Sequence, residues 1–175
     1  MGALVALGVS AVVAFAASPA GRAAVRDSGS VRSSAQTPSL LAAMNVLRRR
    51  HGVAPLHASS ELAAAARAHS AEMARDGYFA HESRDGTSLS ARIVGFYPLG
   101  VYSTWSVGEN LAWASPDLGV ARTIGMWLHS PTHRENLFAP QWREAGIAAV
   151  HVESAPRMFG GEPVTVVTAD FGVRR

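Results

Sequence analysis

The spacing of hydrophobic and polar positions changes along the chain, from a helical period in the first two thirds to a strand period at the end. From Thr37 to Gly52, apolar residues recur every three or four positions, with Thr37 placed to cap a helix and Pro38 in its first turn. The same reasoning predicts a second helix from about Ser60 to Asp76, which Gly77 ends. Further helices are predicted over residues 87–96, from the Ser-Pro pair at 115–116, and from the Ser-Pro pair at 130–131.

The end of the chain is rich in β-branched residues. Residues 146–152 and 163–171 form two such runs, and the glycine pair at 160–161 lies between them, which predicts an antiparallel hairpin. Residues 107–113 are expected to add a third strand. Helices therefore come first and strands last, which favours an α+β fold in which helices cover a small, mainly antiparallel sheet.

The first 36 residues do not share these patterns. Residues 1–24 hold an uncharged apolar run and then small residues, which is typical of a signal peptide, with an uncleaved membrane anchor as the alternative. Residues 25–36 are polar and show no apolar period, so we expect a flexible linker. The folded domain is predicted to span residues 37–175.

Composition excludes several classes of protein. Of 175 residues, 48% are hydrophobic and 17% are charged, which is enough to bury a core. All 16 basic residues are arginine, and only 48–50 and 174–175 are adjacent, so we expect no nucleic-acid partner. The absence of cysteine excludes disulfides, a thiol nucleophile and thiolate metal ligands.

Five short signatures follow one another between residues 37 and 173. Together they resemble the bacterial form of the CAP superfamily, also called SCP-like, of cysteine-rich secretory, antigen 5 and pathogenesis-related proteins. They are Asn-x-x-Arg at 45–48, Phe-x-His at 79–81, Gly-Glu-Asn at 108–110, Trp-x-x-Ser-Pro-x-His-Arg-x-Asn at 127–136, and Asp-Phe-Gly at 170–172.

This resemblance implies an α-β-α sandwich and a cleft in which His81, Glu109 and His133 converge, often around zinc or another divalent ion. One position departs from the family pattern. Where eukaryotic members carry a second glutamate after the tryptophan, Trp127 is followed here by Leu128, His129 and Ser130. Any mechanism that needs two glutamates is therefore in doubt.

Two imidazoles and a carboxylate are a normal ligand set for zinc with an open position for water. We expect His81 and His133 to be the metal ligands, and the alternative is a polar cleft in which they only form hydrogen bonds. Glu109 either orients one of the histidines or accepts from backbone N–H groups at a turn. His69, on a helix face, is interpreted as a half-buried scaffold residue.

Two functions compete on this evidence. The first is an extracellular, non-catalytic binding module for a small apolar or lipid ligand, a peptide or an envelope component, with membrane contact only through an uncleaved leader. Residues 95–105, rich in aromatic side chains, are candidates to wall an apolar pocket, or else ordinary core. The alternative is a metal-dependent hydrolase, peptidase-like, with Glu109 as general base. We expect the protein to be secreted or anchored on the outer face of the membrane. We favour a non-enzymatic role, because no second cleft acid is visible.

Overall fold

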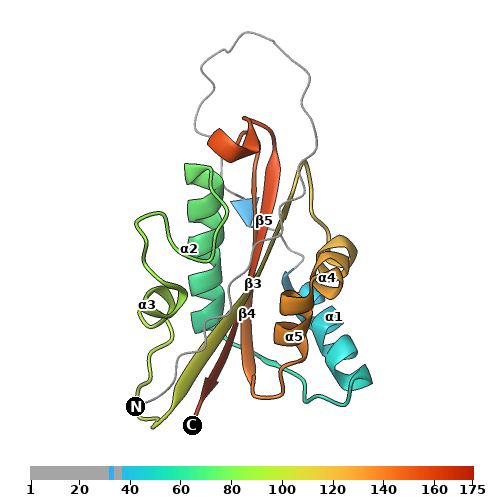
Figure 1. Ribbon diagram of the computed structural model, residues 1–175, viewed down its shortest axis with the longest axis vertical. Coiled ribbons are helices and arrows are strands. Elements are labelled where there is room, and N and C mark those ends of the chain that lie inside the picture. The colour runs from blue at the N-terminus through green and yellow to red at the C-terminus, as the bar shows by residue number, and fades with distance from the viewer. Residues whose placement is uncertain (1–31, 34–36) are drawn as a thin grey trace.

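A mixed sheet with helices on both faces forms the body of the protein. The computed structural model describes residues 32–33 and 37–175, so the predicted leader lies outside the described residues. Figure 1 shows α2 and α3 on one side of the sheet and α1, α4 and α5 on the other. The predicted α-β-α sandwich is confirmed.

The helices begin and end close to where the sequence predicted. They are α1 (Thr37–Arg50), α2 (Ser60–Asp76), α3 (Leu89–Ile93), α4 (Val120–His129), α5 (Pro131–Phe138) and the 3-10 helix η1 (Arg157–Phe159). Ser59 caps α2 by accepting from the Leu62 N–H, and Gly77 closes it at a φ of 67°, a left-handed conformation that glycine adopts without strain.

Two helices differ from the prediction in their limits. The third was predicted over 87–96 but is a single turn, capped by Ser88, because the chain then turns through Gly95 and Pro98 toward the sheet. The fourth was predicted to open at the Ser-Pro pair at 115–116 but begins after Gly119.

The strands are β1 (Arg32–Ser33), β2 (His57–Ala58), β3 (Trp105–Ala114), β4 (Glu144–Val152) and β5 (Val164–Arg174). The sheet runs in the order β1-β4-β5-β3, and β2 pairs with β4. β5 is antiparallel to both β3 and β4, so the expected hairpin and third strand are confirmed. β1 falls within the predicted linker and pairs with the outer side of β4.

The two faces of the sheet bury separate apolar clusters. Alternate side chains of a strand point to opposite faces, so β5 sends Val167, Ala169 and Phe171 toward α1, α4 and α5, and Val164 and Val166 toward α2. Trp127 of α4 is fully buried, and its indole N–H donates to the Leu111 carbonyl at 3.0 Å. This contact holds α4 against the sheet. The same alternation places residues on either side of β3, beside which the candidate site lies.

Candidate functional site

Glu109 lies near the middle of β3, the strand at one end of the sheet. Its neighbour Asn110 faces α5, where its amide donates to the His133 carbonyl at 2.9 Å. Because successive residues of a strand alternate, Glu109 points to the opposite face, toward α2 and α3. Its side chain has no solvent exposure.

Both oxygens of the Glu109 carboxylate are engaged by side chains. His81 Nδ1 lies 2.7 Å from Oε1, and Arg92 Nη2 donates to Oε2 at 2.6 Å. Burial works against the ionised form, but the hydrogen bond from His81 and the charge of Arg92 outweigh it and lower the pKa of Glu109. Of the two roles expected for this residue, orienting a histidine is the one that the contacts support.

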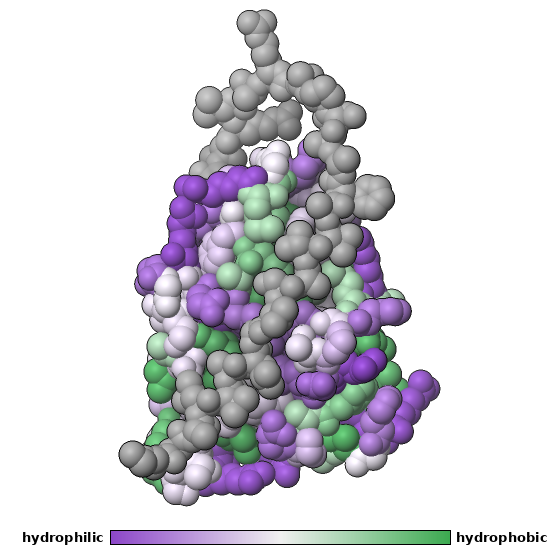
Figure 2. Space-filling model, in the orientation of Figure 1, coloured by the Kyte–Doolittle hydropathy of each residue, from purple (hydrophilic) through white to green (hydrophobic). Residues whose placement is uncertain are grey.

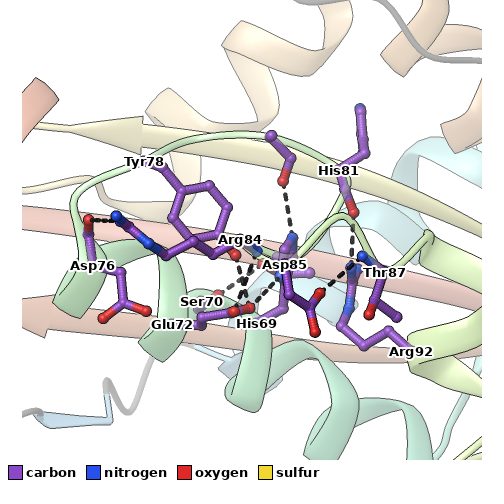
Figure 3. Close-up of polar contacts among 12 residues, drawn as sticks. His69, Ser70, Glu72, Asp76, Tyr78, His81, Arg84, Asp85, Thr87 and Arg92 are labelled. Atoms are coloured by element: carbon purple, nitrogen blue, oxygen red, sulfur yellow. Dashed lines mark hydrogen bonds and ion pairs between the residues drawn. The ribbon is translucent and has the colours of Figure 1, made fainter.

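His81 stands on the loop between α2 and α3, and neighbouring side chains fix that loop (Figure 3). Arg92 Nη1 donates to the backbone carbonyl of His81 at 2.7 Å. Just before His81, the Ala80 carbonyl lies 2.9 Å from Nε2 of His69. Because Nδ1 of His81 faces Glu109, Nε2 is the ring nitrogen left to meet a ligand.

Glu72 on α2 anchors the same loop further out. Its carboxylate accepts from the Tyr78 hydroxyl at 2.7 Å and from the Arg84 backbone N–H at 3.3 Å (Figure 3). Arg84 also donates to the carbonyl of Asp76, at the end of α2. The loop is thus tied to α2 on both sides of His81.

His133 reaches the site from α5, on the other side of β3. Asn136 donates to Asn110 at 3.0 Å and accepts from Trp142 at 2.9 Å. The Asn110 amide, which donates to the His133 carbonyl, therefore holds the backbone of α5 against β3. Asn136 adds a second tie between α5 and β3 through its contact with Asn110.

The electrostatics favour a neutral His133. Burial lowers its pKa, and the charge of nearby His81 lowers it further. A neutral imidazole is the form that binds a metal ion. Among residues 37–175, however, no three His, Asp or Glu side chains gather in a metal-binding arrangement. Glu109, whose two oxygens are engaged by His81 and Arg92, therefore lies behind His81 and completes no three-residue metal site with the two histidines.

Sequence reasoning missed three residues of this site: His69, Arg92 and Asp170. His69 is fully buried, not half-buried as predicted, and burial lowers its pKa, so it is neutral in the folded protein. One signal pointed to Arg92, because it is the only charged residue between Asp85 and Glu109. Asp170 belongs to the Asp-Phe-Gly signature and lies directly opposite Glu109 in the sheet.

The aromatic loop after α3 does not form one pocket wall. Tyr97 is buried in the core, whereas Phe96, Leu99 and Tyr102 are exposed. Figure 2 shows apolar surface at the lower left, where Figure 1 places this segment. A separate hollow of about 400 Å³ opens between α1, the start of α2 and β4, and mostly apolar atoms line it.

The fold is an α-β-α sandwich in which His81 and His133 are held on opposite sides of the edge strand β3. The model of the CAP family, described as the cysteine-rich secretory protein family, matches residues 41–171, so the chain belongs to this family. The predicted resemblance is confirmed, although this member has no cysteine.

One curated relative is 34% identical over 103 residues, an uncharacterized membrane protein, YlbC, of Bacillus subtilis (strain 168). The match covers 59% of this chain and 28% of that protein. No helix in the described part of this chain is long and apolar enough to cross a membrane.

Solved structures share the fold. An extracellular protein of Bacillus anthracis that contains an SCP domain matches with a TM-score of 0.60 and 24% identity, over 80% of this chain and 40% of that one. An outer surface protein of Borrelia burgdorferi matches with a TM-score of 0.63 and 19% identity, over 82% and 98%. At these identities the likeness establishes the fold alone.

Proposed function

We propose that this protein is a secreted or surface-attached, non-catalytic binding module whose His81 and His133 hold a divalent cation, with zinc favoured. The observation that carries the proposal is the state of Glu109. Its carboxylate is buried, and both oxygens already accept from His81 and Arg92. A carboxylate held in this way orients a histidine but has no free oxygen to serve as general base on a water molecule.

The paired histidines match the chemistry of zinc in part. A metal-bound histidine usually donates its other ring N–H to a carboxylate, and His81 Nδ1 faces Glu109 at 2.7 Å in this way. Two imidazoles leave the remaining coordination positions to water or to a ligand group, so we expect modest affinity. A bound cation would supply a positive centre that attracts an anionic group of a ligand.

Calorimetric titration of the full chain with zinc tests this proposal. We expect one site at pH 7 and weaker binding at pH 5, because protons compete with the metal ion for the imidazole nitrogens, although burial lowers the pKa of His133 and reduces this competition at that ring. His81→Ala and His133→Ala should each abolish binding. His57→Ala is the matched control, because His57 is exposed on β2.

Zinc uptake that survives both cleft substitutions would refute the site. Absence of zinc binding at both pH values would leave the cleft as a hydrogen-bonded scaffold. Hydrolysis of a peptide library that depends on zinc and on Glu109 would favour the hydrolase alternative.

The partner in this proposal is a small apolar or lipid molecule, with a peptide or an envelope component as alternatives, and the hollow beside α1 supports the apolar choice. Pro38 and Leu41 of α1 and Ile147 of β4 line it. A volume of about 400 Å³ falls within the range of small-molecule pockets. Its separation from the histidine cleft means that a cation and an apolar ligand could bind independently.

A fluorescent fatty acid is a suitable probe for the hollow. Ala42 lines it and is exposed, so Ala42→Trp should fill the space and weaken probe binding at least tenfold without unfolding the chain. The control is Val46→Trp, one turn further along α1 and outside the lining. Equal probe binding by both variants would exclude the hollow as the ligand site.

A further inference from the structure

Two carboxylates lie side by side beneath His81. Glu109 on β3 and Asp170 on β5 are directly opposite each other in the antiparallel pair, so their side chains emerge on the same face of the sheet. Asp170 has no solvent exposure, and the Glu109 side chain has none either. Directly opposite residues of an antiparallel pair have Cβ atoms about 4.5–5.5 Å apart, so a hydrogen bond between the two carboxyl groups is sterically accessible.

Within the described residues, Arg92 is the only arginine paired with either of these two acids, and His81 adds no positive charge when its ring is neutral, as metal binding requires. Arg92 donates to Glu109 and to the His81 carbonyl, and no salt bridge within the described residues joins it to Asp170. His69, 3.9 Å from Glu109, is neutral because burial lowers its pKa. Two ionised acids would therefore leave one uncompensated negative charge out of reach of water, which costs several kcal/mol.

The polar contacts of Asp170 lead to the same conclusion. Neither of its oxygens has a hydrogen-bond donor among the described residues. An ionised carboxylate accepts only, so two ionised groups cannot bond each other, whereas a protonated carboxyl group has one O–H to donate. A proton on Asp170 would satisfy the contact with Glu109.

We propose that Asp170 is a proton-bearing positioning residue, whose neutral carboxyl group donates its O–H to Glu109 and so fixes the carboxylate that orients His81. Glu109 then accepts from His81, Arg92 and Asp170, and the buried group of residues has no net charge. Burial first, and then the charge of Glu109, raise the pKa of Asp170 well above its usual range, although Arg92 opposes them. The proton comes from solvent when the chain folds, because an aspartate in the unfolded chain is ionised at neutral pH.

Infrared spectroscopy of the full chain at pH 7 tests the protonation directly. We expect the carbonyl stretching band of a neutral carboxylic acid, which exposed and ionised acids do not give. Carbon-13 labelling of aspartate carboxyl groups should shift this band, and Asp170→Asn should remove it. A spectrum without the band, or a band that the aspartate label does not move, would overturn the proposal.

A pair of variants tests the positioning role. Asn keeps a neutral donor toward Glu109 and Ala does not, so nuclear magnetic resonance should find the Nδ1–H form of His81 retained in Asp170→Asn and depleted in Asp170→Ala. An unchanged His81 in Asp170→Ala would show that Asp170 does not position it.

The melting temperature of Asp170→Asn distinguishes a protonated Asp170 from an ionised one. This measurement remains informative even if Asp170→Ala does not fold. Asp170→Asn should melt at or above the wild-type temperature at pH 7, since folding no longer has to take up a proton. A clear drop in melting temperature would mean that an ionised Asp170 is required. None of these measurements uses zinc, so they remain decisive even if the proposed cation does not bind.

Discussion

His69 holds the loop that carries His81, although its place on a helix face resembled that of an ordinary scaffold residue. Its Nε2–H donates to the Ala80 carbonyl at 2.9 Å, one residue before His81. The same histidine lies near Glu109 and Glu72. Protonation of His69 would alter these contacts, so the geometry of the His81 loop depends on pH through this residue.

We expect the contribution of His69 to the free energy of unfolding to decrease as the pH falls from 7 to 5, while the proton that folding places on Asp170 acts in the opposite direction over the same range. Burial lowers the pKa of His69 in the folded chain, whereas an exposed histidine in the unfolded chain takes up its proton near about 6.5. Below that pH the unfolded state binds more protons, so stability is lost by at most about 1.4 kcal/mol per pH unit for this residue.

His69→Gln should reduce this dependence. Its side-chain amide keeps an N–H for the Ala80 carbonyl and does not titrate in this range. Urea unfolding at pH 7 and pH 5 measures the difference, with His57→Gln as an exposed control. An identical pH dependence in His69→Gln and in the wild type would show that His69 is not the group responsible.

The site residues that belong to a sequence signature could be predicted. The site residues that only tertiary packing places there could not. His81, Glu109 and His133 stand in recognisable signatures, so the sequence located them. Arg92 and His69 stand in no signature, and only the folding of α3 and α2 against β3 brings them to Glu109. Asp170 was noted as part of a signature, but its role depends on its register opposite Glu109.

At the scale of elements, the contact between α2 and β4 decides how deeply the helix packs. Gly146 lies on β4 beneath the first turn of α2, and a Cβ built there would overlap the backbone nitrogen of Ala63 and the carbonyl carbon of Leu62. Backbone atoms cannot move aside as a flexible side chain can. Only glycine therefore lets α2 lie this close to the sheet.

Gly146→Ala should destabilise the protein by about 3 kcal/mol or more, at the upper end of the range for overpacking, because the whole helix must shift. Gly125→Ala in α4 is the matched control: nothing lies within 4 Å of its added carbon, and alanine favours a helix by about 0.5–1 kcal/mol. Thermal unfolding of both variants measures these effects. A melting temperature of Gly146→Ala equal to the wild type would contradict the close packing.

Elements were predictable where one local signal dominates. The limits of α2 follow from its apolar period and from Gly77, and the strands follow from runs of β-branched residues. The starts of α3 and α4 were less accurate, because Ser-Pro and Thr-Ser sequences permit a helix or a turn and tertiary packing selects between them. The short strand β2 carries no local signal and exists because its backbone pairs with β4.

At the scale of the whole molecule, the sheet divides the protein into two halves that meet around β3. The loop of His81 belongs to the side of α2 and α3, and His133 belongs to the side of α4 and α5. Each histidine is held by its own network of hydrogen bonds. The relative position of the two histidines therefore depends on how both layers pack against β3 and not on a single loop.

Because β5 lies between β4 and β3, its position in the sheet affects when the sheet can form during synthesis. β3 and β4 do not pair with each other. Both pair with β5, which follows them in the chain. While residues 105–152 emerge, they have no finished sheet to join, and the buried network around Glu109 cannot form without Asp170. The sheet is therefore complete only once β5 has been made, and for the exported protein proposed above we expect this late step to leave the chain unfolded, and so competent for transport, until that point.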